Sequence, residues 1–315
     1  MEFKSLSSQM GAQVIGLDLT KPLAKDDSAT LNEAFYRYRV LLFRQGPISE
    51  EHHVRLMSVL GNVVVEQPGG DPVTYVSTTV DEKVMVRGTM AILFHSEYQF
   101  THYGAIQGQS LYALDVQRDE PTIFADMVRA AKAIPPALRQ RIGALDVIQC
   151  IDFAREYSEG SRFRMSQKTS NTPDDKFPHA QQPLLRRHPI TGEEVLNVSQ
   201  LFTSHIVGMD EATSDVVFAE LNPYQYNSAT CYSHRWQNND LLIWDNYALQ
   251  HAREALEQAY GRHLRRVVIN PVDAATFLSG FHPDAVPGLK GGWPTPLRSS
   301  SADKPVPYSK STVDF

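Results

Sequence analysis

An imidazole and a carboxylate, His95 and Glu97, stand two residues apart in a run that is otherwise mostly apolar and aromatic, 93–100. On an extended strand, residues i and i+2 project to the same face, so these side chains can reach one metal ion together. They leave most of its coordination sphere open, and a third protein ligand is needed. The best candidate is His251, which follows the strand-like run 240–246 and lies 251 − 97 = 154 residues beyond Glu97. We therefore expect a fold in which two distant strands meet at this point.

A His-x-Glu pair alone is a weak signal for a metal site. In a chain with 11 His and 36 acidic residues, such a pair also arises by chance. Two histidines and one carboxylate with open positions are, however, the ligand set of non-haem Fe(II) oxygenases. The same ligands also suit a zinc hydrolase, which is the weaker alternative.

The composition is that of an ordinary globular protein. Of the 315 residues, 42% are hydrophobic and 21% are charged, which excludes disordered and fibrous classes. The formal charge of −6 gives no electrostatic reason to bind nucleic acid. The chain lacks both an apolar run near the ~20 residues that span a bilayer and a signal-peptide core, so we expect a cytoplasmic protein with no membrane partner. Its two cysteines, Cys150 and Cys231, form no Cys-x-x-Cys motif and no disulfide framework.

Periodicity and turn residues predict strands on both sides of a helical insertion. Strands are expected in 11–19, 39–44, 73–77, 90–98, 110–116, 195–198, 232–236, 241–244 and 264–270. Helices are expected in 26–38, in 49–60, on either side of Pro135 and Pro136 between 124 and 145, and in 210–221. We expect His52 and His53 to lie on the surface of the second helix. With metal ligands supplied from both sides, this order predicts one barrel-like, all-β core wrapped by helices.

Two segments are expected to be irregular. Residues 152–183 are polar but carry isolated aromatic side chains, which favours a lid or binding loop over a solvated linker. The tail from about 281 is rich in Pro, Gly and Ser. Because no repeat or linker divides the chain, we expect a single domain over 1–315, with the lid as an insertion.

Further motifs lie at fixed distances from the candidate ligands. Thr122, in the run 121–127, comes 122 − 95 = 27 residues after His95, and Arg262 and Arg266 follow His251 by 11 and 15 residues. In this order and spacing, the motifs resemble the taurine dioxygenase and 2,4-dichlorophenoxyacetate dioxygenase (TauD/TfdA) family of Fe(II)- and 2-oxoglutarate-dependent oxygenases. The resemblance covers nearly the whole chain and includes 11–19, 40–44, 187–192 and 244–246.

The resemblance implies both a fold and a ligand set. The fold is mostly β, with a double-stranded β-helix core of the jelly-roll or cupin-like type flanked by α-helices. His95, Glu97 and His251 are implied to hold Fe(II) as the catalytic residues, with 2-oxoglutarate and O2 as cosubstrates. The usual family sequence is His-x-Asp, but some relatives that hydroxylate amino acids use His-x-Glu. Halogenating relatives have a small residue in place of the acid, so Glu97 argues against halogenation.

Three further residues are implied to contact the cosubstrate or the substrate. Thr122 and Arg262 match the residues that bind the far carboxylate of 2-oxoglutarate, and Arg266 matches an arginine near the cosubstrate or an anionic substrate. The chemistry explains these residue types, because a dicarboxylate in a dry pocket requires a permanent cation with directed donors and a neutral hydroxyl. The alternative for each arginine is a surface salt bridge with a nearby acid such as Glu254 or Glu257.

The sequence thus predicts a 2-oxoglutarate-dependent non-haem iron dioxygenase. It would oxidise a substrate C–H bond, by hydroxylation or desaturation, while 2-oxoglutarate is converted to succinate and CO2. Tyr98, Phe100 and Tyr103 are the candidate substrate contacts, with Arg266 as the partner of an acid group. We therefore expect a small organic acid with an aromatic or bulky apolar part. The competing hypothesis is a small-acid-binding protein that has lost turnover, and homo-oligomer formation stays open.

Overall fold

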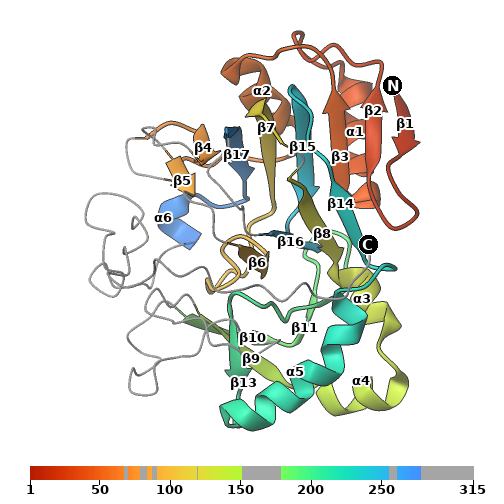
Figure 1. Ribbon diagram of the computed structural model, residues 1–315, viewed down its shortest axis with the longest axis vertical. Coiled ribbons are helices and arrows are strands. Elements are labelled where there is room, and N and C mark those ends of the chain that lie inside the picture. Colours follow the sequence, from red (N-terminus) through yellow and green to blue (C-terminus); the bar gives the residue numbers. More distant parts are fainter. Residues whose placement is uncertain are drawn as a thin grey trace.

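The structure is a computed structural model that describes residues 1–66, 70–78, 84–86, 91–118, 120–150, 179–254 and 261–277. Strands form its centre and helices lie around them (Figure 1). The predicted lid at 152–183 falls mostly outside the described residues, as does the predicted tail from 281. Of the lid segment, only 179–183 is described, and it forms a strand.

The largest sheet has eight strands. They are β1 (Glu2–Ser5), β2 (Ala12–Ile15), β3 (Val40–Arg44), β4 (Thr74–Ser77), β5 (Val84–Val86), β7 (Gly108–Val116), β15 (Asp240–Asp245) and β17 (Arg262–Ile269). Their order across the sheet is β1-β2-β3-β15-β7-β17-β4-β5. Every residue of the central strand β15 is buried, because both faces of the sheet are covered.

A second sheet of four strands faces the first. Its strands are β6 (Ile92–His95), β8 (Thr122–Asp126), β14 (Cys231–His234) and β16 (Leu249–Arg253), in the order β14-β8-β16-β6. Side chains from both sheets share one apolar core, in which the rings of Phe124 and Trp244 meet edge to face at 5.2 Å. This pair of sheets is the barrel-like core that the sequence predicted.

Two helices, α1 (Lys25–Tyr38) and α2 (Glu50–Leu60), cover the outer face of the large sheet. Helix α2 begins after Ser49, whose hydroxyl accepts a hydrogen bond from the amide N–H of His52, and it ends before Gly61. The start and end that the sequence predicted for this helix are confirmed.

The prediction that His53 lies on the surface of α2 is wrong. His53 is fully buried, and its Nε2 lies 2.7 Å from the hydroxyl of Ser110 on β7. Arg265 of β17 donates from Nε to its Nδ1 at 3.2 Å. His53 stands three and four residues before Leu56 and Met57, so it shares their sheet-facing side of the helix. Because both ring nitrogens have partners, the helix can bury a polar ring there.

The remaining elements form a layer at the lower end of the molecule in Figure 1. The helices there are α3 (Met127–Ala133), α4 (Pro136–Ile142) and α5 (Glu211–Gln225). The strands are β9 (Asp146–Cys150), β10 (His179–Pro183) and β13 (Thr203–Ile206), in the order β10-β9-β13, and the pair β11 (Leu185–Arg187) and β12 (Glu194–Leu196). A short helix, α6 (Ala274–Phe277), follows β17. The break between α3 and α4 at the two prolines is as predicted.

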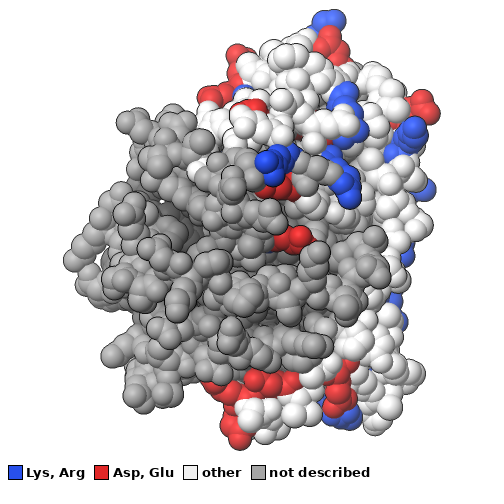
Figure 2. Space-filling model, viewed as in Figure 1, with Lys and Arg blue, Asp and Glu red and all other residues white. Residues whose placement is uncertain are grey.

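Among the described residues, no helix has the length and apolar character needed to cross a membrane. The charged side chains that Figure 2 shows on the described surface are of both signs. Acidic side chains gather at the lower edge of that view, and Lys and Arg are interspersed with Asp and Glu along the upper edge.

One buried carboxylate connects the two sheets to the helical layer. Asp126, the last residue of β8, is fully buried and caps α3 by accepting from the amides of Val128 and Arg129 at 2.9 Å each. Its other oxygen accepts a hydrogen bond from Arg39 Nη1 at 2.5 Å. Burial raises the pKa of Asp126, although the Arg39 guanidinium and the amide hydrogen bonds oppose that rise. Asp126 thus accepts hydrogen bonds from the first amides of α3 and also balances the charge of the largely buried Arg39.

We expect Asp126→Ala to lower the free energy of unfolding by about 3–5 kcal/mol, because it removes a helix cap and leaves Arg39 without its buried partner. Urea denaturation measures this loss. The matched control is Asp210→Ala. Asp210 is the exposed N-cap of α5 and accepts from the amide of Thr213, so its replacement should lower the free energy of unfolding by only about 1 kcal/mol. Equal losses in the two variants would contradict the role given to the buried ion pair.

Candidate active site

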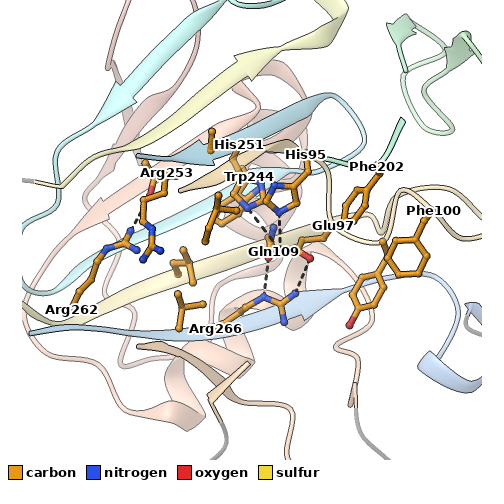
Figure 3. A pocket seen from close by; sticks show the side chains of 16 residues that line it. His95, Glu97, Phe100, Gln109, Phe202, Trp244, His251, Arg253, Arg262 and Arg266 are labelled. Atoms are coloured by element: carbon orange, nitrogen blue, oxygen red, sulfur yellow. Dashed lines mark hydrogen bonds and ion pairs between the residues drawn. The ribbon is translucent and has the colours of Figure 1, made fainter. Parts of the chain in front are cut away.

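Two histidines meet because β6 and β16 are neighbouring antiparallel strands. His251 stands directly opposite His95 in the register, and the centroids of their rings are 4.3 Å apart. Residues directly opposite on paired strands project to the same side of a sheet. Both rings therefore enter the space between the two sheets (Figure 3).

Glu97 joins them by a route that the sequence did not predict. The strand expected over 90–98 ends at His95, and Glu97 lies in the turn that follows. The side chain of Asn246 holds this turn: it accepts from the Glu97 amide at 3.0 Å and donates to the Glu97 carbonyl at 3.2 Å. It also donates to the carbonyl of Ile106 at 3.0 Å. The strand argument was therefore wrong for Glu97, although the side chain does reach the histidines.

The three side chains form a compact donor set. One ligand atom from each lies within 4.8 Å of the others. Glu97 Oε1 is 3.5 Å from His95 Nε2 and 3.9 Å from His251 Nε2. His95 Nδ1 lies 2.6 Å from the carbonyl of Leu93. Because a carbonyl only accepts, Nδ1 is the donor in this contact, and Nε2 is the ring nitrogen that faces Glu97.

The charges of this donor set suit a divalent cation. Burial, together with the nearby His95, holds the pKa of His251 well below its usual value, so its imidazole is neutral. Burial alone would raise the pKa of Glu97, but His95 and the Arg266 guanidinium outweigh it and hold that pKa well below the usual range. Two imidazole nitrogens and one carboxylate with open positions are the ligands that Fe(II) takes in non-haem oxygenases. The residues present fit such an ion.

A buried cation and a hydroxyl lie at one end of the same pocket. Arg262 begins β17, Thr122 begins β8, and Arg262 Nη2 donates to Thr122 Oγ1 at 3.2 Å. Trp236 Nε1 donates to the same oxygen at 3.0 Å. Arg262 is 4% exposed, which excludes the surface salt bridge considered from the sequence.

The guanidinium of Arg262 is placed to bind an anion. Its buried Nε has no hydrogen-bond partner among the described residues. Burial lowers the pKa of Arg262 to about 9, and the neighbouring Arg253 adds to that effect. Both arginines lie at the end of the pocket away from Phe100 and Phe202 (Figure 3). A carboxylate brought to this end would relieve the cost of burying the cation.

Arg266 has partners that the sequence did not predict. Its Nη1 forms an ion pair with Glu66, which is 5% exposed. Its Nε donates to Gln109 Oε1 at 3.0 Å, and its Nη2 lies 3.9 Å from Glu97 Oε2. Burial would lower the pKa of Arg266, but the carboxylates of Glu66 and Glu97 outweigh it and raise that pKa. Glu66, Gln109 and Arg253 were missed, because no sequence motif marks a lone residue whose partner is distant in the chain.

The predicted aromatic contacts divide into two groups. Tyr98 and Phe100 are buried and line the pocket together with Phe202, which the sequence did not single out. Tyr103 is 55% exposed and is not among the residues that line the pocket, so its prediction as a substrate contact is not supported. It lies in the loop between β6 and β7, beyond the turn that faces the cavity.

Residues 2–268 match the model of one protein family, described as taurine catabolism dioxygenase TauD, TfdA family. The chain belongs to this family. It is an Fe(II)- and 2-oxoglutarate-dependent dioxygenase, and its two facing sheets are the jelly-roll core of the TauD-type fold. Membership favours the oxygenase over the zinc hydrolase and the non-catalytic binding protein.

The curated relatives act on unlike substrates. The chain is 24% identical over 273 residues to the alpha-ketoglutarate-dependent 2,4-dichlorophenoxyacetate dioxygenase of Cupriavidus pinatubonensis, covering 81% of this chain and 92% of the relative. It is 25% identical over 284 residues to pentalenolactone F synthase of Streptomyces avermitilis, covering 83% and 91%. Alpha-ketoglutarate is 2-oxoglutarate. The name of the first relative includes this cosubstrate, and the two names together do not identify one substrate.

Solved structures show the same fold. AAD-2 in complex with Mn(II) and N-oxalylglycine superposes with a TM-score of 0.69 at 25% identity, covering 85% of this chain and 96% of that chain. A taurine dioxygenase from Burkholderia xenovorans superposes with a TM-score of 0.68 at 21% identity, covering 85% and 90%.

We expect Asn246→Ala to raise the dissociation constant for Mn(II) about 10- to 100-fold, because the turn that aims Glu97 would lose its support. Isothermal titration of the metal-free protein with Mn(II) measures this change. The control is Gln225→Ala, which removes an equally buried amide that donates to the Val198 carbonyl at 2.7 Å. Unchanged Mn(II) affinity in Asn246→Ala would show that the turn holds its shape without that side chain.

Proposed function

We propose that His95, Glu97 and His251 hold Fe(II), and that this enzyme oxidises a C–H bond of a small molecule bound beside them. The observation that carries the proposal is the convergence of two imidazoles and one ionised carboxylate at the wall of a pocket. Three protein ligands leave positions for the cosubstrate and for O2.

We further propose that Arg262 and Thr122 bind the far carboxylate of 2-oxoglutarate. Arg262 contributes a desolvated cation with an unpartnered Nε, and Thr122 contributes a hydroxyl that two donors already orient. Charge-assisted hydrogen bonds from a guanidinium are strong and directional in such a pocket. This end lies across the pocket from Phe100 and Phe202, so cosubstrate and substrate would occupy different ends of the same cavity.

When bound, Fe(II) and 2-oxoglutarate supply the oxidation of the substrate by O2, with 2-oxoglutarate leaving as succinate and CO2. The chain's own residues provide the rest. Glu97 stays ionised, and the hydrogen bond from His95 Nδ1 to the Leu93 carbonyl orients the ring with Nε2 toward Glu97. Phe100, Phe202 and Trp244 contribute apolar surface to the pocket wall.

The walls of the pocket support a substrate with an apolar body. Besides the aromatic residues, the pocket is lined by Val76, Ile92 and Leu111. The apolar part of the predicted substrate is therefore kept as a proposal. The acid group is not kept, because Arg266, its intended partner, already holds Glu66. Hydroxylation is the default outcome, and desaturation uses the same ligands.

Replacing His95 or His251 by Ala should abolish 2-oxoglutarate turnover and lower Mn(II) affinity, because one of three protein ligands is lost. The more conservative Glu97→Asp keeps the charge but is shorter by one C–C bond of about 1.5 Å, so we expect weaker metal binding with residual turnover. Succinate formation and Mn(II) titration measure the two effects. Full turnover in either histidine variant would mean that another set of ligands holds the metal.

Arg262→Ala should weaken binding of 2-oxoglutarate by about 2–5 kcal/mol, because the far carboxylate would lose a desolvated charged partner. Thr122→Val should cost about 1–2 kcal/mol for one hydrogen bond. The matched control is Arg265→Ala, on the same strand. Arg265 is just as buried, but it bonds to His53 and to the Ile48 carbonyl on the helix side of the sheet.

Saturation with 2-oxoglutarate, measured by succinate formation, separates these variants. Arg265→Ala should lower stability and leave the cosubstrate requirement unchanged. Equal 2-oxoglutarate requirements in Arg262→Ala and the wild type would move the cosubstrate carboxylate to another part of the pocket.

A further inference from the structure

Arg266 lies at the centre of the pocket wall with all three guanidinium nitrogens engaged. Nη1 pairs with Glu66, Nε donates to Gln109, and Nη2 faces Glu97 at 3.9 Å. The side chain is 4% exposed. An incoming anion would therefore find no guanidinium nitrogen on Arg266 without a neighbour.

Both carboxylate oxygens of Glu66 take part in this arrangement. Oε2 accepts a hydrogen bond from Arg266 Nη1, and Oε1 accepts one from the hydroxyl of Tyr98 at 2.5 Å. Glu66 and Tyr98 are both buried. An anion that displaced Glu66 from Arg266 would leave a buried carboxylate without its cation, which is strongly unfavourable. The charges of Glu66 and Arg266 thus cancel each other, while Glu97 is balanced by the metal.

Gln109 offers a neutral contact at the same place. Its Oε1 accepts from Arg266 Nε, and a guanidinium can only donate, so the amide is oriented with its oxygen toward the arginine. Its buried Nε2 consequently points elsewhere and has no hydrogen-bond partner among the described residues. Gln109 is 1% exposed and lines the pocket between the metal ligands and Arg266 (Figure 3). A buried N–H group without a partner is stabilised when an oxygen acceptor binds to it.

The other guanidinium groups of the pocket lie at the cosubstrate end. Figure 3 places Arg253 and Arg262 on the side away from Phe100 and Phe202. The 2-oxoglutarate carboxylate proposed above would use that end. Within the described residues, Arg266 is therefore the only arginine or lysine that lines the pocket outside the cosubstrate end.

We propose that Glu66 is a specificity-determining residue: by neutralising Arg266 it excludes anionic substrates, and Gln109 binds a neutral oxygen of the substrate, such as a carbonyl, hydroxyl or ether oxygen. The substrate class is then an uncharged apolar molecule with one oxygen acceptor near the oxidised carbon. This deepens the proposed function and rests on it, because it takes the metal and 2-oxoglutarate to be bound in this pocket.

The test uses the full chain loaded with Mn(II) and N-oxalylglycine, which cannot turn over. Isothermal titration compares matched acid and amide pairs: benzoate with benzamide, phenylacetate with phenylacetamide, and 3-phenylpropanoate with 3-phenylpropanamide. We expect the wild type to bind at least one amide, and to bind it at least about tenfold more tightly than its acid. An acid that binds as tightly as its amide, or the absence of binding by every amide, would overturn the proposal.

Glu66→Gln keeps the size of the side chain and removes its charge. We expect this variant to gain at least about tenfold in affinity for the acids and to change little for the amides, because Arg266 would become an uncompensated cation. The matched control is Glu220→Gln, which removes one charge from an exposed pair with Arg141 and should gain nothing. A folded Glu66→Gln variant without this gain would overturn the role of Glu66. If that variant does not fold, the wild-type comparison of acid with amide decides alone.

Gln109→Leu tests the neutral contact. We expect it to weaken amide binding at least about tenfold while the affinity for N-oxalylglycine stays the same. A loss of N-oxalylglycine affinity instead would assign Gln109 to the cosubstrate and overturn its role toward the substrate. Failure of the wild type to bind Mn(II) and N-oxalylglycine at all would overturn the proposed function itself, which separates the two failures.

Discussion

The antiparallel pairing of β16 with β6 sets His251 directly opposite His95, and a slip of one residue would turn His251 to the other face of the sheet. The pairing of β16 with β8 on its other side sets His251 opposite Phe124 and so fixes that register twice. Two histidines that are 251 − 95 = 156 residues apart in sequence thus become neighbours through strand pairing. Asn246 then brings Glu97 to the same point by holding the turn after β6.

The second constraint is the balance of buried charge along β17. Arg262 and Arg266 face the pocket, whereas Arg265 faces the helices on the other side of the sheet. The three buried cations are balanced in different ways. Arg265 is bound by neutral acceptors, Arg266 is paired with Glu66, and Arg262 retains an Nε that no described residue satisfies. The pocket can therefore distinguish two ligands by charge: an anion is favoured at Arg262, whose Nε is unsatisfied, and a neutral group is favoured at Arg266, whose charge is neutralised.

Much of the fold was predictable from local patterns. The caps of α2, the proline break between α3 and α4 and the apolar run of β15 each depend on residues close together in the chain. His53 was misplaced because an isolated polar residue on a helix favours the surface unless a partner is known. That partner, Ser110, is 57 residues away. The predicted strand over 90–98 failed at Glu97 for the same reason, since Asn246 bends the chain there from a distance of 149 residues.

The sequence by itself determined the class of chemistry, because the types and spacings of His95, Glu97, His251, Thr122 and Arg262 are properties of the chain. It also determined that the core is built from strands. Only the tertiary structure decided the role of Arg266, whose charge is cancelled by Glu66, a residue 200 positions away. Only the structure showed Tyr103 to be exposed and brought Gln109 and Phe202 to the pocket wall. The physical reason is that a side chain's charge and hydrogen-bonding capacity depend on what is packed against it, and long-range contacts leave no spacing signal in a single sequence.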